Sequence, residues 1–298
     1  MNAFDVVCVG ESMALVTPDP PRALSEGGPT RLDVAGAEST VACYVAMLGA
    51  RAAWASSVGD DPLGTLLQNR IASYGVDTSH VIVDPEAPTG VFFKDPGQVG
   101  ATTRVYYYRA GSAASRLGPG LRPPPSRVLH LSGITPALSV SCAALVDRLL
   151  DGPALVSFDV NYRPGLWPTA RAGPELRRLA GRAGIVFVGL DEAKALWGAE
   201  RPDDVRALLP EPAVLVVKDG ATGVTSYGPH GVAFAPAPAV EVIEPVGAGD
   251  AYAAGYLFGF LHDLPEASRL RLGHLVAGVA LRVAGDVARL PADLLADL

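Results

Sequence analysis

The feature that most constrains this chain is the regular alternation of apolar runs and helical spacing through its middle. Arg127 to Gly133 and Leu155 to Asn161 have the composition of buried strands, with a helical stretch from about Ser139 to Leu150 between them. Two further strand-like runs follow, Ile185 to Val188 and Ala213 to Val217. A strand, a helix and a second strand in this order form a parallel βαβ unit. The pattern therefore predicts an α/β fold whose active site lies beyond the carboxyl ends of the strands.

The overall composition limits the kinds of partner. The chain has 298 residues, of which 49% are hydrophobic and 18% charged, which suits a folded protein with a substantial core. Its formal net charge of −7 argues against non-specific nucleic-acid binding. An anionic substrate would consequently need arginine or lysine side chains placed locally in its site.

The cysteines and the hydropathy pattern suggest where the protein works. Cys8, Cys43 and Cys142 are odd in number and widely spaced, with neither disulfide nor metal spacing. No secretory signal precedes the first strand-like run, Val6 to Gly10, and no apolar run reaches about 18 residues. We expect a cytoplasmic protein without a membrane partner.

A glycine-rich turn near the C-terminus, within residues 244–257, is the strongest chemical signal. A strand-like run, Val240 to Ile243, leads to a turn at Pro245, and helical spacing begins at Asp250. The intervening residues are Gly247, Ala248 and Gly249. A turn of this kind before a helix directs unpaired backbone N–H groups at one point, where the helix dipole adds positive charge. We expect an anion to bind there, most simply a phosphate in transfer.

Asp250 stands in the first turn of that helix, beside the expected anion site. An ionised carboxylate there can accept a proton from a hydroxyl that attacks phosphorus. The alternative is that Asp250 only caps the helix. A dinucleotide fingerprint fails because Tyr252 occupies its third glycine position, and no Gly-Lys-Ser/Thr follows to make a Walker A loop.

The run Val-Gly-Ala-Gly-Asp-Ala-Tyr-Ala-Ala-Gly, residues 246–255, resembles the C-terminal signature of the ribokinase-like, PfkB-type carbohydrate kinases. The resemblance implies that Gly247, Ala248 and Gly249 form an anion hole and that Asp250 is the catalytic base. It also implies ATP and Mg²⁺ as cofactors. The family usually has Asp-Thr where this chain has Glu244 and Pro245.

The N-terminal third carries two weaker matches to that family. At residues 35–40 the family's Gly-Gly-x-x-x-Asn motif implies that Gly36, Ala37 and Thr40 bind sugar hydroxyls, although the segment also suits an ordinary helix start. Val-Gly-x-Asp-x-x-Gly at 58–64 matches the N-terminal signature and indicates a helix capped at Asp61. Residues 12–34 are either a long loop or short strands of an accessory sheet.

Two predicted strands, Thr89 to Lys94 and Arg104 to Arg109, flank a polar loop from Asp95 to Thr103. In the family this hairpin belongs to a lid over the sugar. Tyr-Tyr-Arg-x-x-Ser-Ala-Ala-Ser at 107–115 resembles the 2-keto-3-deoxygluconate kinase branch. The implied substrate-binding residues are Phe92, Tyr107, Tyr108 and Arg109. An arginine pairs a sugar-acid carboxylate well, but an aromatic strand with a surface arginine is the alternative.

Polar residues leave the strand that ends near Asp159, in an Asp-x-Asn-x-Arg motif of the same family. The match implies that Asn161 and Arg163 lie near the transferred phosphate and that Arg163 also reaches the sugar acid. It implies that Asp159 helps to hold Mg²⁺ through water. Glu192 matches a second metal-ordering residue, and an acid at a helix start is the alternative reading.

The remaining implied positions concern the nucleotide and one further substrate contact. Lys-x-Gly-x-x-Gly at 218–223 matches the family's nucleotide loop. The match implies that Lys218, Gly220 and Gly223 bind the nucleotide. The alternative is that the segment is only a turn between strands. Residues 265–284 are predicted to form a last amphipathic helix. Within it, His274 stands where the family often has an asparagine near adenine, and a surface histidine is the alternative. Asp286 matches an acid that touches substrate in the keto-deoxy acid kinases.

These observations predict a ribokinase-like, Rossmann-type three-layer α/β core, one kinase domain over residues 1–298, with lid segments at about 12–34 and 88–110. The expected reaction is ATP-dependent phosphorylation of a sugar acid, with a homodimer formed through the lid. A fructose, ribose or nucleoside kinase is one alternative. A non-catalytic sugar-acid or nucleotide sensor of the same fold is the other.

Overall fold

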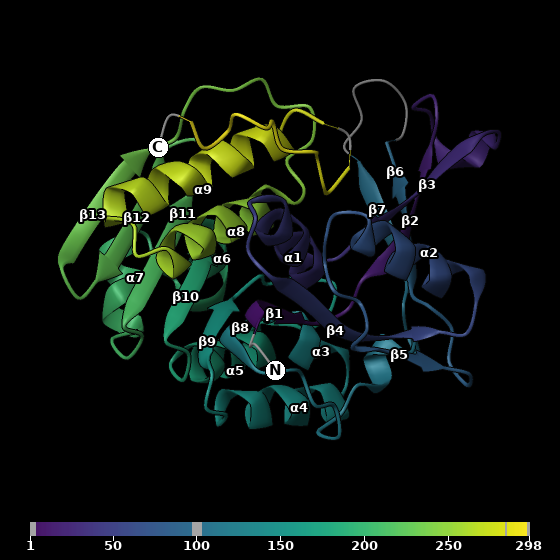
Figure 1. Cartoon of the computed structure of the whole chain (residues 1–298), viewed down its shortest axis with the longest axis horizontal. Helices are drawn as coiled ribbons and strands as arrows, with labels where there is room; N and C mark the ends of the chain where they lie inside the picture. Colours follow the sequence, from purple (N-terminus) through teal and green to yellow (C-terminus); the bar gives the residue numbers. More distant parts are fainter. Residues whose placement is uncertain (1–3, 97–102, 284, 297–298) are drawn as a thin grey trace.

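A large sheet with parallel strands at its centre forms the core of the protein (Figure 1). The computed structural model describes residues 4–96, 103–283 and 285–296. The sheet has nine strands in the order β13-β12-β11-β10-β9-β8-β1-β4-β5. Neighbours from β11 to β5 are parallel, and β12 and β13 form an antiparallel extension at one edge. The strands are β1 Phe4–Val9, β4 Ala52–Gly59, β5 Val81–Asp84, β8 Ser126–Ser132, β9 Leu155–Asp159, β10 Ile185–Gly189, β11 Val214–Asp219, β12 Gly223–Gly228 and β13 Gly231–Pro236.

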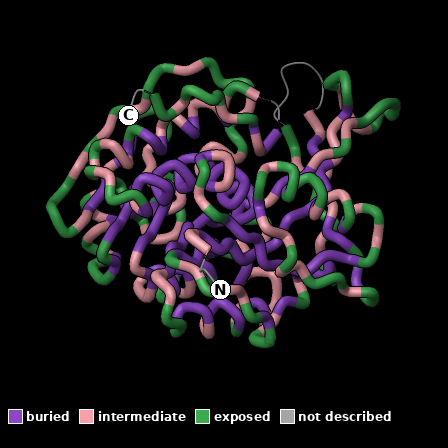
Figure 2. Tube along the Cα trace, in the orientation of Figure 1, coloured by how far each residue is buried: buried purple, intermediate pink, exposed green. Residues whose placement is uncertain are grey.

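Helices cover both faces of this sheet, so the expectation of a three-layer core is confirmed. Alternate residues of β1 show the two sides, because Val6 and Cys8 belong to one apolar cluster while Val7 and Val9 belong to the other. The buried residues form a continuous interior beneath an exposed rim (Figure 2). On the first face lie α1 Ala37–Met47, α2 Pro62–Ala72, α8 Ala248–Leu261 and α9 Glu266–Ala280. On the second lie α3 Thr135–Leu138, α4 Val140–Leu150, α5 Thr169–Ala180, α6 Leu190–Trp197 and α7 Pro202–Leu208.

A second sheet of four strands stands beside the core and is called the lid here (Figure 1). Its order is β3-β2-β6-β7, with β2 Met13–Pro18, β3 Thr30–Ala35, β6 Val91–Asp95 and β7 Arg104–Tyr108. Residues 12–34 therefore supply two strands, together with the 3₁₀ turn η1 Leu24–Glu26, and are not one long loop. A second 3₁₀ turn, η2 Ala114–Arg116, follows the lid. The expected polar loop between β6 and β7 includes residues 97–102, which lie outside the described residues.

Local sequence signals set several helix ends as expected. The Asp61 side chain accepts a hydrogen bond from Gly64 N at 2.8 Å, and Pro62 begins α2. Ser139 caps α4 in the same way, accepting from Cys142 N at 3.1 Å. These caps satisfy amide groups that a helix start otherwise leaves unpaired.

Two expectations about the C-terminal region are wrong. Residues 240–243 form no strand, because Ile243 N donates to Leu281 O at 2.8 Å and, among the residues that the structure describes, no strand pairs with the segment. Val242 and Ile243 are more than half exposed, so their β-branched side chains lack the packed neighbours that stabilise a strand. The last helix, expected to reach residue 284, ends at Ala280.

Two further observations bear on the chain's environment. Within the described residues, no helix combines the length and apolar character needed to cross a bilayer. Cys8, Cys43 and Cys142 are all buried and free.

Candidate active site

A cavity of about 1000 Å³ lies where the lid faces the carboxyl ends of the core strands and the start of α8. Of the residues singled out from the sequence, the following line it: Gly36, Ala37, Phe92, Tyr107, Arg109, Asp159, Asn161, Arg163, Glu192, Lys218, Gly220, Gly247, Ala248, Gly249, Asp250, His274 and Asp286. They come from segments that are far apart in the chain. The parallel strands bring them together because their carboxyl ends share one edge of the sheet.

The start of α8 presents the glycine-rich turn to this cavity. Gly247 adopts a left-handed conformation, φ +84°, which a residue with a side chain rarely adopts. Among the described residues, none accepts a hydrogen bond from Gly247 N or Gly249 N, and Ala248 N makes only a long contact of 3.4 Å to Pro245 O. These amides and the positive end of the helix dipole form the kind of site that binds an anion.

Asp250 follows directly and faces the same space. It is 8% exposed, and its Oδ1 accepts a hydrogen bond from Asn161 Nδ2 at 3.1 Å. Burial and the nearby charge of Asp159 together raise the pKa of Asp250 to about 7, and the charges of Arg163 and Lys218 oppose that rise. A carboxylate with a pKa near neutrality is well matched to accept a proton at physiological pH.

A buried cluster of charges lies next to Asp250. Lys218 Nζ donates to Asp159 Oδ2 at 2.7 Å, and Glu192 Oε2 accepts from Gly189 N at 2.9 Å. Although burial alone would lower the pKa of Lys218, Asp159 and Glu192 raise it. Burial and the charge of Asp159 together raise the pKa of Glu192 to about 7, and the charge of Lys218 opposes that rise. The carboxylates around Lys218 thus favour its charged form at the edge of the cavity.

The same carboxylates are the groups that could hold a metal ion. No group of three or more histidine, cysteine or acidic side chains with metal-binding geometry occurs in the part of the chain that the structure describes. Mg²⁺ is usually held by one or two carboxylates together with waters and substrate phosphates. Asp159 and Glu192 therefore suit Mg²⁺ that arrives with a nucleotide, and they do not suit an all-protein metal cage.

Arg163 brings a positive charge to this end of the cavity. Its side chain is 45% exposed and lies 3.8 Å from Glu192 Oε1, and its Nη1 donates to Tyr162 O at 3.2 Å. The part-exposed guanidinium lines the cavity, where an incoming anion can reach it.

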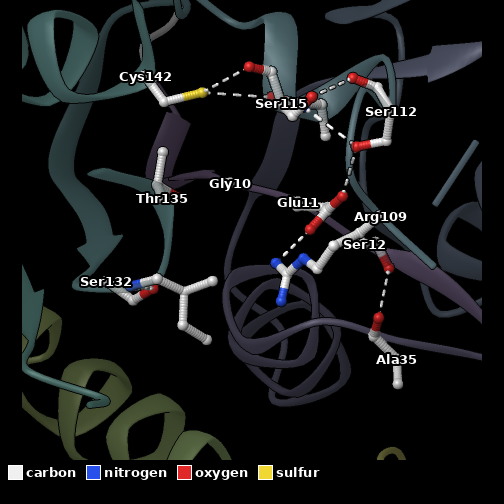
Figure 3. Close-up of polar contacts among 12 residues, drawn as sticks. Gly10, Glu11, Ser12, Ala35, Arg109, Ser112, Ser115, Ser132, Thr135 and Cys142 are labelled. Carbon is white, nitrogen blue, oxygen red and sulfur yellow. Dashed lines mark hydrogen bonds and ion pairs between the residues drawn. The ribbon is translucent and has the colours of Figure 1, made fainter. Parts of the chain in front are cut away.

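The lid end of the cavity contains a buried ion pair that joins the two sheets (Figure 3). Arg109 follows β7 of the lid, and its guanidinium contacts the carboxylate of Glu11, which follows β1 of the core. Ser112 Oγ donates to the other oxygen of Glu11 at 2.8 Å. Gly90 permits this arrangement, because a Cβ there would lie 2.9 Å from Glu11 Oε1. Burial raises the pKa of Glu11, and Arg109 and Ser112 oppose the rise.

Arg109 can still meet a ligand in spite of this pair, because it lines the cavity. Its Nε is buried and has no hydrogen-bond partner among the described residues, so only the rest of the guanidinium can face a ligand. Beside it, Tyr107 stacks on Phe92 with ring centroids 5.6 Å apart. A guanidinium next to an aromatic wall can bind a planar carboxylate.

Lys94 supplies a second lid cation. It lies two residues beyond Phe92 on β6, its side chain is 6% exposed, and its Nζ is 3.2 Å from Glu244 Oε2 and 3.7 Å from Asp286 Oδ1. Burial raises the pKa of Asp286 to about 6, and the charge of Lys94 opposes that rise.

Three of the residues singled out from the sequence do not line the cavity. Thr40 is 1% exposed within α1, and Tyr108 is 68% exposed, with its ring 5.5 Å from that of Phe93 on the side of the lid away from Tyr107. Gly223 packs against β13, where a Cβ would lie 2.4 Å from Ala235 O. The structure therefore gives Gly223 a role in the β12–β13 hairpin.

His274 lies at the nucleotide side that the sequence indicated. Its Nε2 is 3.2 Å from Ala235 O, and its ring meets Tyr252 edge to face at 5.2 Å. Burial lowers the pKa of His274, so the ring is neutral near pH 7. A neutral, half-buried ring in a cavity that Val240 and Val242 also line provides a surface for a flat base.

The sequence reasoning missed Glu11 and Lys94. Glu11 follows the carboxyl end of a buried strand, and this was the signal that drew attention to residues 159–163. Lys94 offered no such signal, because a lysine near the end of a hairpin strand is ordinarily exposed.

Comparison with known proteins identifies relatives over nearly the whole chain. The family model described as pfkB family carbohydrate kinase matches residues 3–293. A 2-dehydro-3-deoxygluconokinase from Bacillus subtilis (strain 168) is 34% identical, covering 97% of this chain and 93% of the relative. A 2-dehydro-3-deoxygluconokinase from Thermoproteus tenax is 33% identical, covering 97% and 91%.

Solved structures share the fold. The structure of a PfkB protein from Polaromonas sp. JS666 has a TM-score of 0.86 and 32% identity, covering 96% of this chain and 98% of the other. Aminoimidazole riboside kinase from Salmonella enterica, solved with aminoimidazole riboside and an ATP analogue, has a TM-score of 0.83 and 23% identity, covering 98% of this chain and 99% of the other.

Proposed function

Because the chain belongs to the pfkB family of carbohydrate kinases, we propose that it transfers the γ-phosphate of ATP to a hydroxyl of a sugar acid. The best candidate is 2-keto-3-deoxygluconate, converted to its 6-phosphate, since the relatives with 34% and 33% identity carry the name of that kinase. The observation that carries the proposal is the buried Asp250 carboxylate in a cavity beside the unpaired amides of Gly247 and Gly249.

In the proposed reaction, the acceptor hydroxyl lies between Asp250 and the anion site. Asp250 takes the hydroxyl proton as the oxygen attacks the γ-phosphorus, and the bond from that phosphorus to the β,γ-bridging oxygen breaks to release ADP. Asn161 orients the carboxylate through its 3.1 Å hydrogen bond. The amides of Gly247 to Gly249 stabilise the negative charge that develops on the transferred group. Arg163 turns from Glu192 to add positive charge there.

The nucleotide lies on the opposite side of the anion site, toward β11 and α9. Lys218, Gly220 and His274 line that part of the cavity and support this placement. ATP is the expected donor because the chain is a carbohydrate kinase and a structural neighbour was solved with an ATP analogue. Asp159 and Glu192 would hold Mg²⁺ through its waters. Mg²⁺, when bound, neutralises phosphate charge.

The lid end selects the acceptor. Arg109 offers guanidinium donors to a carboxylate, while Phe92 and Tyr107 form an aromatic wall. Gly36 and Ala37, with Asp286, provide backbone and carboxylate acceptors for sugar hydroxyls. A neutral hexose would not need Arg109, which is why a sugar acid is favoured over fructose or ribose.

An acceptor panel in a coupled ADP-release assay tests the proposal. The panel contains 2-keto-3-deoxygluconate, fructose, ribose and a nucleoside, each with Mg²⁺ and ATP. We expect the sugar acid to have the highest kcat/KM. A preference for fructose, ribose or the nucleoside would identify a sibling kinase instead, and no acceptor-dependent turnover would favour a non-catalytic sensor of the same fold.

We also propose that two copies pair through their lids. The strand register aligns Leu32, Val16, Phe93 and Tyr106 across the four strands on the face away from the cavity. Leu32 and Tyr106 are each 43% exposed and Tyr108 is 68% exposed, so an apolar strip faces outward. Light scattering on a size-exclusion column checks this proposal, and a monomer at working concentration would contradict it.

A cytoplasmic location remains our expectation. Three buried free thiols suit a reducing compartment. Fractionation of the producing cell, with recovery of the kinase activity in the soluble cytoplasmic fraction, is the measurement.

A further inference from the structure

Lys94 is a buried cation that the proposed reaction does not use. It lies on the face of β6 that carries Phe92, and its side chain is 6% exposed. Lysine is rarely buried unless it is paired with an opposite charge. Its placement therefore depends on the carboxylates around it.

Both partners of Lys94 belong to the core and not to the lid. Glu244 Oε2 lies 3.2 Å from Lys94 Nζ, and Asp286 Oδ1 lies 3.7 Å from it. The pairs join residues 150 and 192 positions apart in the sequence. Lys94 is thus a direct link between the lid and the C-terminal part of the core.

The two carboxylates in turn flank the turn that carries the anion site. Glu244 Oε1 accepts a hydrogen bond from Val246 N at 3.3 Å. Gly247 packs against the backbone of Asp286, since a Cβ at Gly247 would lie 3.0 Å from Asp286 O and 3.3 Å from Asp286 Cα. The hydrogen bond from Val246 to Glu244 fixes the beginning of the turn. The packing of Gly247 against Asp286 fixes the first glycine of the anion site.

The charges explain why a cation is needed at this place. Glu244 and Asp286 carry like charges close together, and the charge of Glu244 raises the pKa of Asp286 beyond the effect of burial. Lys94 offsets both carboxylates. Without it, Asp286 would take up a proton or the two acids would move apart, and either change would alter the support of residues 244–247.

We propose that Lys94 is a positioning residue that couples the lid to the anion site, so that the Gly247–Gly249 amides reach their catalytic positions only when the lid is in place. The inference rests on the proposed function and deepens it. It assigns to one lid side chain an effect on phosphoryl transfer, although that side chain need not touch the phosphate.

The test compares Lys94→Met, Lys94→Arg and Arg104→Met in the full-length protein. Methionine keeps most of the volume and removes the charge, while arginine keeps the charge. Arg104 is an exposed cation on the neighbouring strand β7 and does not line the cavity, so it is the matched control. Steady-state kcat and KM for the acceptor and for ATP are measured, together with Tm.

We expect Lys94→Met to lower kcat by about ten- to a hundredfold, because small displacements of preorganised groups have effects of that size. The KM for ATP should change little, Lys94→Arg should recover most of the activity, and Arg104→Met should behave as the wild type. Wild-type kcat in Lys94→Met, or equal losses in the methionine and arginine variants, would overturn the inference.

A second readout does not depend on turnover. Hydrogen–deuterium exchange of peptides that cover residues 244–257 should be faster in Lys94→Met than in the wild type, and unchanged exchange would count against the coupling. If Lys94→Met does not fold, Glu244→Gln removes one partner charge and should produce the same change in exchange. Absence of wild-type turnover with every acceptor would instead reject the proposed function.

Discussion

The two ends of the cavity are built in different ways. At the phosphate end, Asp159, Lys218 and Asp250 all belong to the core, and the 2.7 Å pair between Lys218 and Asp159 lies within one sheet edge. At the lid end, Glu11 pairs with Arg109 across two separate sheets. The charged groups around Asp250 thus rest on a single frame, while the groups that select the substrate depend on how two frames meet. Variants at the first end should change kcat, and variants of Glu11 and Arg109 at the second should change mainly the KM for the acceptor. Lys94 is the lid residue for which we expect a change in kcat, because it pairs with Glu244 and Asp286 beside the glycine-rich turn.

The largest effect is expected for Asp250→Ala, because it removes the proposed base. The kcat should fall by about 10²- to 10⁴-fold in the ADP-release assay, with little change in Tm. Asp250→Asn is the matched control, since its Oδ1 can still accept from Asn161. The asparagine variant should be as inactive as the alanine variant, and a near-native rate in either would refute the assignment.

Arg109→Ala should affect the lid end of the cavity. The KM for the sugar acid should rise by about ten- to a hundredfold, because one charged hydrogen-bonding group is lost, while the KM for ATP changes little. Equal changes in both KM values would remove the argument for a carboxylate-bearing substrate.

Arg109→Ala also leaves Glu11 buried without its partner, so a loss of stability has to be separated from a loss of binding. Breaking a buried pair on one side costs about 3–5 kcal/mol. The double variant Glu11→Gln with Arg109→Met removes both charges and should recover much of that stability. It should keep the high KM for the sugar acid. Chemical denaturation measures the stability of each variant, and steady-state kinetics measures the KM.

The rate should depend on pH through the base. Burial raises the pKa of Asp250 to about 7, so the carboxylate is protonated below that pH and cannot accept a proton. The kcat/KM for the acceptor should therefore fall toward tenfold per pH unit below about pH 7. The charge of Asp286 contributes to this rise, so Asp286→Asn should move the acidic limb to lower pH. A profile that is flat down to pH 5 would contradict the assignment.

A smaller effect is expected for Glu11→Gln. Glutamine can still accept a hydrogen bond from Arg109, but the charge that holds the guanidinium is gone. The KM for the sugar acid should rise by about two- to tenfold at nearly constant kcat, and Tm should fall. Glu26→Gln, an exposed lid position, is the control and should change neither quantity.

The smallest effect separates neighbouring tyrosines. Tyr107→Ala should raise the KM for the sugar acid by about two- to threefold, because Tyr107 lines the cavity beside Phe92. Tyr108→Ala should leave that KM near the wild-type value, since Tyr108 lies on the other side of β7. A larger effect for Tyr108 would mean that the acceptor reaches beyond the described cavity.

Much of the fold was predictable because its signals are local. The alternation of strands and helices predicted the layered core, and Asp61 and Ser139 predicted the starts of two helices. The run Val240 to Ile243 misled because β-branched residues suit a strand only where a neighbouring strand pairs with them. That partner is a tertiary property, which four residues cannot reveal.

The residues of the site also differ in whether a local signal or a distant partner reveals them. Gly247 to Asp250 and Asp159 to Arg163 are contiguous motifs whose chemistry can be read along the chain. Glu11 and Lys94 matter through partners roughly 100 to 200 positions away, so no local pattern reports them. Glu11 could have been suspected from its place after a buried strand, but the burial of Lys94 depends on how the lid sits on the core.

The balance of charge around the cavity has a consequence for the end of the catalytic cycle. Its lining includes six acidic side chains, Glu11, Asp159, Asp191, Glu192, Asp250 and Asp286, against four basic ones, Lys94, Arg109, Arg163 and Lys218. A newly phosphorylated sugar acid carries more negative charge than the sugar acid that entered, and it leaves beside a protonated Asp250. When that proton is lost to solvent, repulsion should speed departure of the product, so a pre-steady-state burst of ADP should be weaker at high pH than at low pH.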